Sequence, residues 1–188
     1  MAEMTIRAAT PADLNLIHRE LQDVILTSPF YNERFKAHEA GRLDMTFLKN
    51  LMAIDPWHIM IMSIDGVPGG AVVSDPELGA IFRLWSWVFP AFRQSRLGMF
   101  GMRAFDEHWD NGRFHKAFTY VRPENEIARL LLKRYGYTET CLLRQHIFGQ
   151  DYLVYEKFYS RQEDLPYDSG YVGRFSGLKR RLKGLVGA

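Results

Sequence analysis

Residues 88–98, VFPAFRQSRLG, decide the fold of this chain. They join an aromatic-rich strand to a helix predicted over 97–109, so a strand, a sharp turn and a helix N-terminus follow one another directly. The free amide hydrogens of such a helix start, with the positive end of the helix dipole behind them, suit an anion such as a pyrophosphate. Gly98 permits a close backbone approach, and Arg93 and Arg96 add positive charge. A basic turn of this kind also occurs on ordinary protein surfaces, so this stretch alone leaves both interpretations open.

The chain just before this stretch predicts an antiparallel meander. The nearly continuous apolar run at 58–64 ends at Asp65-Gly66, the dipeptide that most strongly signals a hairpin. Residues 70–74 form the returning strand, and 80–89 form the third strand of the meander.

The N-terminal part predicts one strand followed by helices. A short strand at 5–7 leads into a helix start at Thr10-Pro11-Ala12-Asp13, which offers an N-cap, a proline at the first helical position and an acid in the first turn. This helix ends at Ser28-Pro29. Residues 30–55 are predicted to be helical, with Asp44 as an N-cap.

The last part of the domain predicts a strand at 116–121, a helix at 125–135 stopped by Gly136, and two strands at 137–148 and 151–159. The full order is β-α-α-β-β-β-α-β-α-β-β. This is an α+β chain with an antiparallel meander followed by one parallel β-α-β crossover.

Three segments together resemble the GNAT family, the Gcn5-related N-acetyltransferases. Residues 6–14, IRAATPADL, look like the usual start of such a domain, and 88–98 resembles the acyl-coenzyme A loop of the family. Residues 122–137, RPENEIARLLLKRYGY, resemble the later segment in which an Asn opens a helix that ends in Gly-Phe or Gly-Tyr. The resemblance covers residues 5–160 in the expected order, and this conjunction is more specific than any one segment.

The resemblance implies a GNAT-like acyl-CoA N-acyltransferase fold, a mixed, mostly antiparallel and splayed sheet flanked by helices. It also implies acetyl-coenzyme A as a co-substrate in the wedge between the diverging strands 81–89 and 116–121, where an amine attacks the thioester directly. The pantetheine would pair with the backbone near Trp87 and Val88, and Asn125 would face the coenzyme from the next helix. The other residues implied in coenzyme binding lie in the turn: Arg93, Gln94, Ser95, Arg96, Leu97 and Gly98.

The chain departs from the family pattern at three places. Arg96 stands where the loop usually has its first glycine, so the amide nest carries a side chain that contacts phosphate or crowds it. Leu132 stands where many members place a tyrosine as general acid. The strand 81–89, which often carries a glutamate base, has no carboxylate and offers only Arg83 and Ser86 as polar groups.

These departures limit the catalytic candidates to Tyr135 and Ser86. Tyr135 lies one turn beyond Leu132 and is expected to replace the missing acid, with Tyr137 as the alternative, although a tyrosine at such a place is also typical of a core. A water relay or an already neutral amine would take the place of the missing base.

The segment that in this family walls the acceptor pocket combines rings and carboxylates that suit an amine. Ordinary helix packing explains the same residues. They are Phe30, Tyr31, Glu33, Phe35, Glu39, Asp44 and Phe47.

Charge is divided unevenly along the chain. The sequence has 24 Lys and Arg against 22 Asp and Glu, a formal net charge of +2. Five of the basic residues lie in the last twenty positions, where no acid occurs, so the first 168 residues carry 19 basic against 22 acidic residues, a net −3. We expect one domain over 1–160 and a C-terminal extension over 161–188 with a basic amphipathic tail. The tail suits an anionic surface, a homodimer or a larger protein assembly, whereas the body gives no indication of nucleic acid.

The remaining signals concern location and metals. Cys141 is the only cysteine, so an intramolecular disulfide is impossible, and we expect an inert core thiol. The histidines show no metal-ligand spacing, and no metal is expected. The apolar stretches near 57–64 and 84–92 are shorter than the roughly 18 residues that a membrane span needs. The sequence therefore predicts a cytoplasmic protein without a membrane span.

Two functions of different classes follow from these patterns. The first is an acetyl-CoA-dependent N-acetyltransferase that acts on a primary amine of a small molecule or a protein. The alternative is a catalytically degenerate module with the same fold, docked by its basic tail into a larger assembly such as a virus particle. An open wedge between 84–89 and 117–121 would support the first, and a wedge filled by side chains the second.

Overall fold

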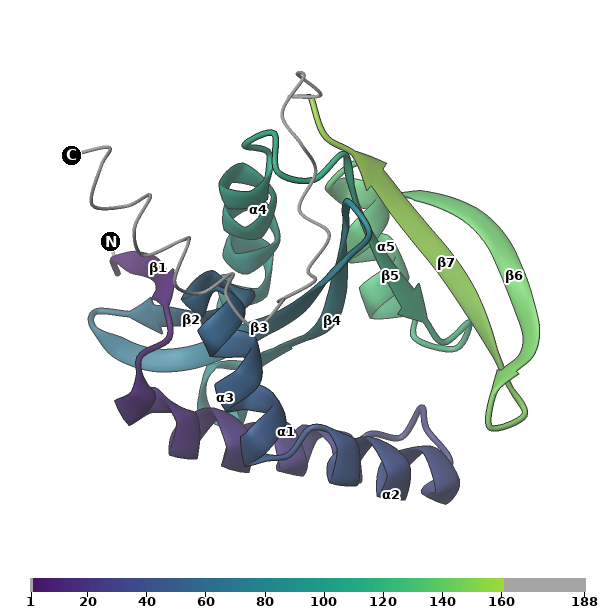
Figure 1. Cartoon of the computed structure of the whole chain (residues 1–188), viewed down its shortest axis with the longest axis horizontal. Coiled ribbons are helices and arrows are strands. Elements are labelled where there is room, and N and C mark those ends of the chain that lie inside the picture. Colours follow the sequence, from purple (N-terminus) through teal and green to yellow (C-terminus); the bar gives the residue numbers. More distant parts are fainter. Residues whose placement is uncertain (1, 161–188) are drawn as a thin grey trace.

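The computed structural model describes residues 2–160 (Figure 1). One seven-stranded sheet runs through this part of the chain in the order β1-β2-β3-β4-β5-β7-β6. Its strands are Met4–Ala8 (β1), Ile59–Ile64 (β2), Val67–Glu77 (β3), Ala80–Val88 (β4), Lys116–Val121 (β5), Thr138–Ile147 (β6) and Gln150–Phe158 (β7). Neighbouring strands pair antiparallel except β4 and β5, which are parallel. The predicted mixed, mostly antiparallel sheet is confirmed. The predicted extension over 161–188 and its basic tail lie outside the described residues.

Helices cover both faces of the sheet. Between residues 2 and 160 the α-helices are Leu14–Thr27 (α1), Glu33–Arg42 (α2), Met45–Ile54 (α3), Leu97–Trp109 (α4) and Glu126–Arg134 (α5). Short 3-10 turns occupy Pro11–Asp13, Pro56–His58 and Pro90–Phe92. Figure 1 shows α1 to α3 on one side of the sheet and α4 and α5 on the other. The connection from β4 through α4 to β5 is the predicted parallel crossover.

Local capping explains where the first helices begin. The Asp13 carboxylate accepts hydrogen bonds from the Thr10 backbone N–H (2.8 Å) and from Thr10 Oγ1 (2.6 Å). Asp44 Oδ1 accepts from the Phe47 N–H (2.7 Å), as the sequence predicts. Asn32 caps α2 in the same way, so the single helical region predicted over 30–55 is divided into two helices, each with its own N-cap.

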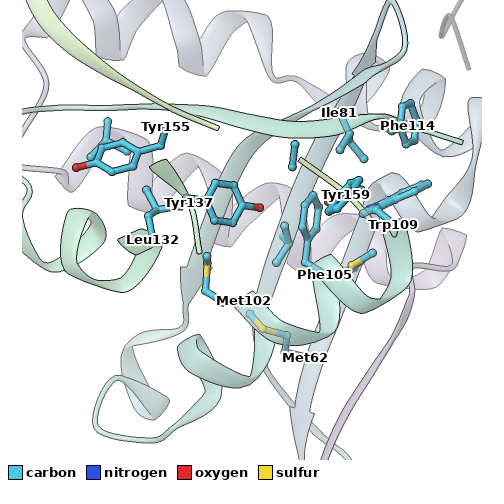
Figure 2. Close-up of a cluster of buried hydrophobic side chains, with 14 of the residues drawn as sticks. Met62, Ile81, Met102, Phe105, Trp109, Phe114, Leu132, Tyr137, Tyr155 and Tyr159 are labelled. Atoms are coloured by element: carbon cyan, nitrogen blue, oxygen red, sulfur yellow. The ribbon is translucent and has the colours of Figure 1, made fainter. Parts of the chain in front are cut away.

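Two apolar clusters hold these layers together. Figure 2 shows the larger cluster, in which Phe105 and Trp109 of α4 lie beside Tyr159, while Tyr155 of β7 lies near Leu132 of α5. The second cluster joins α1 and α3 to the opposite face of the sheet through residues such as Ile17, Leu48 and Ile61. Each side of the sheet therefore has its own core.

A β-bulge in β4 sets the direction of its side chains. β3 pairs Val73 with Trp85 and Ser74 with Arg83, so Leu84 is an extra residue in β4. The bulge places the Arg83 side chain over Phe105 of α4, while Trp85 packs in the cluster of α1 and α3.

The parallel strands β4 and β5 separate soon after they meet. They pair only over Ala80–Phe82 and Lys116–Phe118. Thr119 Oγ1 then donates a hydrogen bond to the Arg83 carbonyl oxygen (2.9 Å) at the point of separation. Beyond it β4 continues to pair with β3, and β5 with β7. The splayed sheet predicted from the resemblance is thus present.

Candidate functional site

The gap between the splayed strands is an open cavity of about 800 Å³. Residues 83–86 of β4 and 119–121 of β5 form two of its walls. Helix α5 and the preceding Asn125 form a third, and the end of α1 with the following loop closes the far side. Side chains do not fill this wedge, so it has room for an extended ligand.

The turn from β4 into α4 borders this cavity through Arg93. Ser95 Oγ accepts the hydrogen bond of the Leu97 N–H (3.2 Å), and the Ser95 N–H donates to the Phe92 carbonyl oxygen. The amide hydrogens of Gln94, Arg96 and Gly98 have no acceptor within residues 2–160. Donors therefore remain free at the N-terminus of a 13-residue helix, as the sequence predicts.

Unpaired positive charge surrounds these free donors. Arg93 and Arg96 are both exposed, and neither forms an ion pair with another residue of the described chain. A Cβ atom placed on Gly98 would meet only Val88 Cγ2, at 3.5 Å, so the approach to the helix start is open. The turn therefore presents an electropositive, accessible surface for an anion.

Asn125 caps helix α5 and also lines the wedge cavity. Its Oδ1 accepts from the Ala128 N–H (3.2 Å) and caps α5, and the residue lines the cavity. The backbone of Trp87 and Val88 is paired with Ala71 and Gly70 of β3, whereas β5 has already diverged on their other side. The Trp87 side chain itself is buried among the α1 and α3 residues.

A second cavity of about 410 Å³ adjoins the first. The two cavities share Tyr31, Leu84, Trp85 and Tyr120 in their walls. The second one is rich in aromatic side chains from α2, β4, β5 and the β6–β7 hairpin. Its other aromatic and imidazole residues are Phe35, His38, Phe82, His146, Phe148 and Tyr152.

The charge inside this aromatic cavity is neutralised. Glu39 is only 5% exposed, and both of its carboxylate oxygens accept hydrogen bonds from the Arg42 guanidinium (2.8 and 3.0 Å). Glu39 also accepts from Trp85 Nε1 (3.0 Å). Burial raises the pKa of the Tyr31 hydroxyl to about 12, so this group keeps its proton at neutral pH.

Hydrogen bonds join the loop before α2 to the β6–β7 turn, and these two segments lie near each other in Figure 1. Asn32 Nδ2 donates to the Phe148 carbonyl oxygen (3.0 Å), and Gln150 Nε2 and Arg122 Nε both donate to the Phe30 carbonyl oxygen (3.2 and 3.0 Å). Segments almost 120 residues apart therefore form one wall.

This architecture resembles that of several solved structures. No protein-family model matches the sequence, and no curated protein matches it. Among solved structures, yncA from Salmonella typhimurium, with its cofactor acetyl-CoA, superposes with a TM-score of 0.68 at 17% identity over 88% of this chain and 98% of that one. The chain has the GNAT fold.

Two further structures with the GNAT fold agree. The ribosomal-protein-alanine N-acetyltransferase of Brucella melitensis has a TM-score of 0.67 and 18% identity, over 82% of this chain and 99% of that one. The ribosomal-protein-S18-alanine N-acetyltransferase of Escherichia coli has a TM-score of 0.62 and 14% identity, over 88% of this chain and all of that one (100%). The likeness confirms the predicted fold class, and at these identities it concerns the fold alone.

Within the GNAT fold, the structure separates the two residues predicted to be catalytic. Ser86 lines the wedge cavity and accepts a hydrogen bond from Arg83 Nη2 (2.9 Å). Tyr135 packs against the larger core cluster at the end of α5, where its carbonyl oxygen accepts from Lys157, and it does not line either of the two cavities. Its position past the last turn of α5 turns it away from the wall that Leu132 forms.

Tyr137, the alternative acid, is also a core residue. It is 3% exposed, and its hydroxyl donates to Asp106 Oδ1 (2.7 Å). In Figure 2 its ring lies between Leu132 and Phe105, with the hydroxyl directed away from Leu132. Burial raises its pKa well above the ordinary value of tyrosine, and the nearby Asp106 carboxylate adds to this.

The residues expected to wall the acceptor pocket divide into two groups. Tyr31, Phe35 and Glu39 line the aromatic cavity, and Phe30 lines the wedge. Glu33 pairs with Lys36 at 2.9 Å, Asp44 caps α3, and Phe47 lies under the Arg42 guanidinium. The second group therefore supports the helices and does not line the pocket.

Sequence reasoning gave little weight to Arg83, Asp23 and the residues of β5 that line the wedge. Arg83 and Thr119 are buried, and their place on the cavity wall depends on the divergence of two strands more than thirty residues apart. No pattern in the neighbouring sequence predicts such a position.

The structure corrects the expectation for Cys141. It lies on β6, the last strand in the sheet order, and its side chain is exposed. It is not a core thiol, because β6 is an edge strand and most of its side chains, Cys141 included, are exposed. Among residues 2–160 no cluster of three His, Cys, Asp or Glu side chains is arranged to hold a metal, and no helix in this range is long and apolar enough to cross a membrane.

Proposed function

We propose that this chain is an acetyl-CoA-dependent N-acetyltransferase that acts on a primary amine. The observation that carries the proposal is the open wedge between β4 and β5, together with the free amide hydrogens in the turn that reaches the cavity wall through Arg93. An eroded binding module, the alternative, would have no need to keep this wedge empty. The acetyl-CoA in the yncA structure supports the same ligand class here.

The residues present fit the coenzyme. The pyrophosphate would take the free amides of Gln94, Arg96 and Gly98, with the unpaired Arg93 and Arg96 side chains nearby. Because Arg96 is exposed, its side chain adds charge at the nest without filling it. The pantetheine would follow the β4 edge that β5 leaves unpaired, and Asn125 would face it from the start of α5. Acetyl-CoA would supply an activated acetyl group in the wedge.

The aromatic cavity supports an acceptor amine carried on an apolar or aromatic body. Its rings provide contact area for such a body, and the Glu39 charge is already neutralised by Arg42. The Tyr152 ring lines this cavity, and its hydroxyl is buried without a hydrogen-bond partner among residues 2–160. Asp23 lines the rim of the wedge, where its carboxylate attracts a protonated amine.

Residues of this chain would orient the reaction. Tyr31, Leu84, Trp85 and Tyr120 stand between the two cavities, so an amine that passes among them reaches the wedge beside Ser86. This arrangement brings the two reactants together in a defined orientation and limits the access of water.

The lone cysteine, which leaves no disulfide to form, supports the predicted cytoplasmic location.

The first test is calorimetric titration of the full chain with acetyl-CoA. We expect saturable binding, weakened at least about tenfold when Arg93 and Arg96 are both changed to Ala, because each removes a charge from the phosphate site. Arg103→Ala, an exposed arginine further along α4, is the matched control and should leave the affinity unchanged. Absence of binding by the wild-type protein at millimolar acetyl-CoA would refute the proposed function.

The acceptor is tested by thiol release from acetyl-CoA with a panel of amines. We expect phenethylamine and similar monoamines to be better substrates than spermidine, because the aromatic cavity has no free carboxylate for a second ammonium group. Peptides with a free N-terminal alanine form the second arm of the panel, since two proteins with this fold acetylate ribosomal proteins at alanine. A preference for spermidine would contradict the assignment of the aromatic cavity to the acceptor.

A further inference from the structure

Glu39 is the only carboxylic acid among the described residues that line the aromatic cavity. It is only 5% exposed, and its Oε1 accepts a hydrogen bond from the Trp85 indole Nε1 at 3.0 Å. Burial raises the pKa of the Tyr31 and Tyr152 hydroxyls, and the negative charge of Glu39 adds to the effect on both. The carboxylate therefore lies within electrostatic reach of three other side chains of this cavity.

Arg42 neutralises this carboxylate. Its Nη2 donates to Glu39 Oε1 (2.8 Å) and its Nε donates to Oε2 (3.0 Å), so one planar cation binds both oxygens. Arg42 lies three residues after Glu39, in the last turn of α2, where the helix dipole favours a cation. The Arg42 side chain is 38% exposed and that of Glu39 only 7%. The cavity wall thus carries an ion pair whose anion is the buried member.

Stability alone does not explain why the wall holds a charged pair. Replacement of a buried ion pair by uncharged side chains of similar volume is often neutral or stabilising. A neutral amide oxygen at position 39 would satisfy the Trp85 N–H equally well. The pair does decide how the cavity treats a charged ligand. An unpaired carboxylate among these rings would attract a second ammonium group, and an unpaired guanidinium would attract a carboxylate.

We propose that Arg42 is a specificity-determining residue of the acceptor site: by holding both oxygens of Glu39, it makes the aromatic cavity select amines whose body carries no further charge. This inference rests on the proposed function and on the assignment of the aromatic cavity to the acceptor. The reacting amine points toward the wedge, and the rest of the acceptor lies among the rings beside Glu39. A second ammonium group there finds the carboxylate already bound, so it loses its hydration without gaining a partner. Arg42 takes no part in the acetyl transfer itself.

The test compares three acceptors of similar shape that differ in one group. They are phenethylamines that carry an isobutyl, a dimethylaminomethyl or a carboxymethyl group opposite the aminoethyl chain, so the body is neutral, cationic or anionic. Each has a single primary amine to acetylate. Thiol release from acetyl-CoA by the full chain gives kcat/KM for each compound at neutral pH. We expect the wild type to prefer the neutral compound by at least about tenfold, because either charged group would stay unpaired in the cavity.

Two single substitutions should redirect this preference in opposite ways. Arg42→Met leaves the Glu39 carboxylate unpaired and should raise the cationic-to-neutral ratio of kcat/KM by about 10- to 100-fold. Glu39→Gln leaves the guanidinium unpaired and should raise the anionic-to-neutral ratio by a similar factor. The double variant Glu39→Gln/Arg42→Met removes both charges and should keep the neutral preference of the wild type.

The matched control is Arg34→Met, an exposed arginine of the same helix that does not line the cavity. Because its charge is screened by solvent, neither ratio should change by more than about twofold. Loss of one partner of a buried pair lowers stability, but a ratio of two kcat/KM values does not depend on the amount of folded protein. If Arg42→Met does not fold, the anionic-to-neutral ratio of Glu39→Gln decides. A merely structural pair would lower the melting temperature and leave both ratios unchanged.

The outcomes separate this inference from the function on which it rests. Ratios that stay at the wild-type value in both single variants would overturn the role of Arg42 and leave the proposed function intact. The same holds if the wild type acetylates a peptide with N-terminal alanine but none of the three phenethylamines. If the wild type neither binds acetyl-CoA nor releases thiol with any amine, both fail. A cationic preference that appears in Arg42→Met and is lost in the double variant establishes the role.

Discussion

Gly101 of α4 packs against Met62 of β2, and Gly101→Ala tests the packing that positions the turn before α4. A Cβ atom at this position would lie 2.1 Å from Met62 Sδ. Since non-bonded heavy atoms pack at about 3.5–4.0 Å, the sulfur would have to move by about 1.5–2 Å. Met62 is only 1% exposed, so it has no solvent to move into.

The expected cost follows from two opposing effects. Overpacking of a core costs about 1–3 kcal/mol, and alanine in place of glycine inside a helix recovers about 1 kcal/mol. The 2.1 Å approach places the overpacking in the upper part of that range, about 2–3 kcal/mol. The net loss in the free energy of unfolding is then about 1–2 kcal/mol, which for a chain of this size lowers the melting temperature by about 2–8 °C. Differential scanning calorimetry of the full chain measures it.

Gly98→Ala is the matched control in the same helix. Its Cβ would meet Val88 Cγ2 at 3.5 Å, an ordinary contact, so its melting temperature should be unchanged or slightly higher. The same substitution should weaken acetyl-CoA binding, because it places a methyl group at the proposed phosphate site. A Gly101→Ala protein at least as stable as the wild type would refute the packing argument.

Two other substitutions test local features of the fold. Asn125→Ala removes the cap of α5 and should lower the free energy of unfolding by about 1 kcal/mol. We expect a lower urea midpoint together with a higher Kd for acetyl-CoA, because the residue also lines the wedge. A lower midpoint with an unchanged Kd would show that Asn125 has a structural role only. The hydrogen bond from Arg7, aided by Thr10, holds the pKa of Asp13 well below its usual range. Because its folded pKa is depressed, the stability that Asp13 contributes is fully present above about pH 4 and is lost as the pH falls through the folded value. The urea midpoints of the wild type and Asp13→Asn should therefore differ at pH 7 and converge in acid, and a constant difference would contradict the assignment.

Several elements could be predicted because their causes lie within a few residues. Asp65-Gly66 adopts positive φ values of 49° and 79° at a two-residue hairpin turn, which few other dipeptides adopt without strain. Asp44 and Asn125 cap helices through the amide three residues later. The strand–turn–helix at 88–98 likewise places its free amides by local geometry alone.

Other features depend on which distant segments meet. Cys141 was expected in a core because it lies in a strand, but this strand is at the edge of the sheet and leaves its side chain exposed. Tyr135 was expected near the chemistry because of its spacing from Leu132, but the end of α5 turns it into the core cluster. Neither outcome can be read from the neighbouring sequence.

The order of the elements, their caps and turns, and the free amide hydrogens at the start of α4 follow from the sequence, because each of these depends on backbone conformation and hydrogen bonds between near neighbours. Where β4 and β5 part, and therefore which side chains face the wedge, depends on contacts between segments far apart in the chain. The three-residue pairing of these strands and the bulge at Leu84 bring Arg83 to the cavity wall. Its burial arises from contacts with α4 and the last strands, so the position of this arginine depends on long-range packing and not on local sequence.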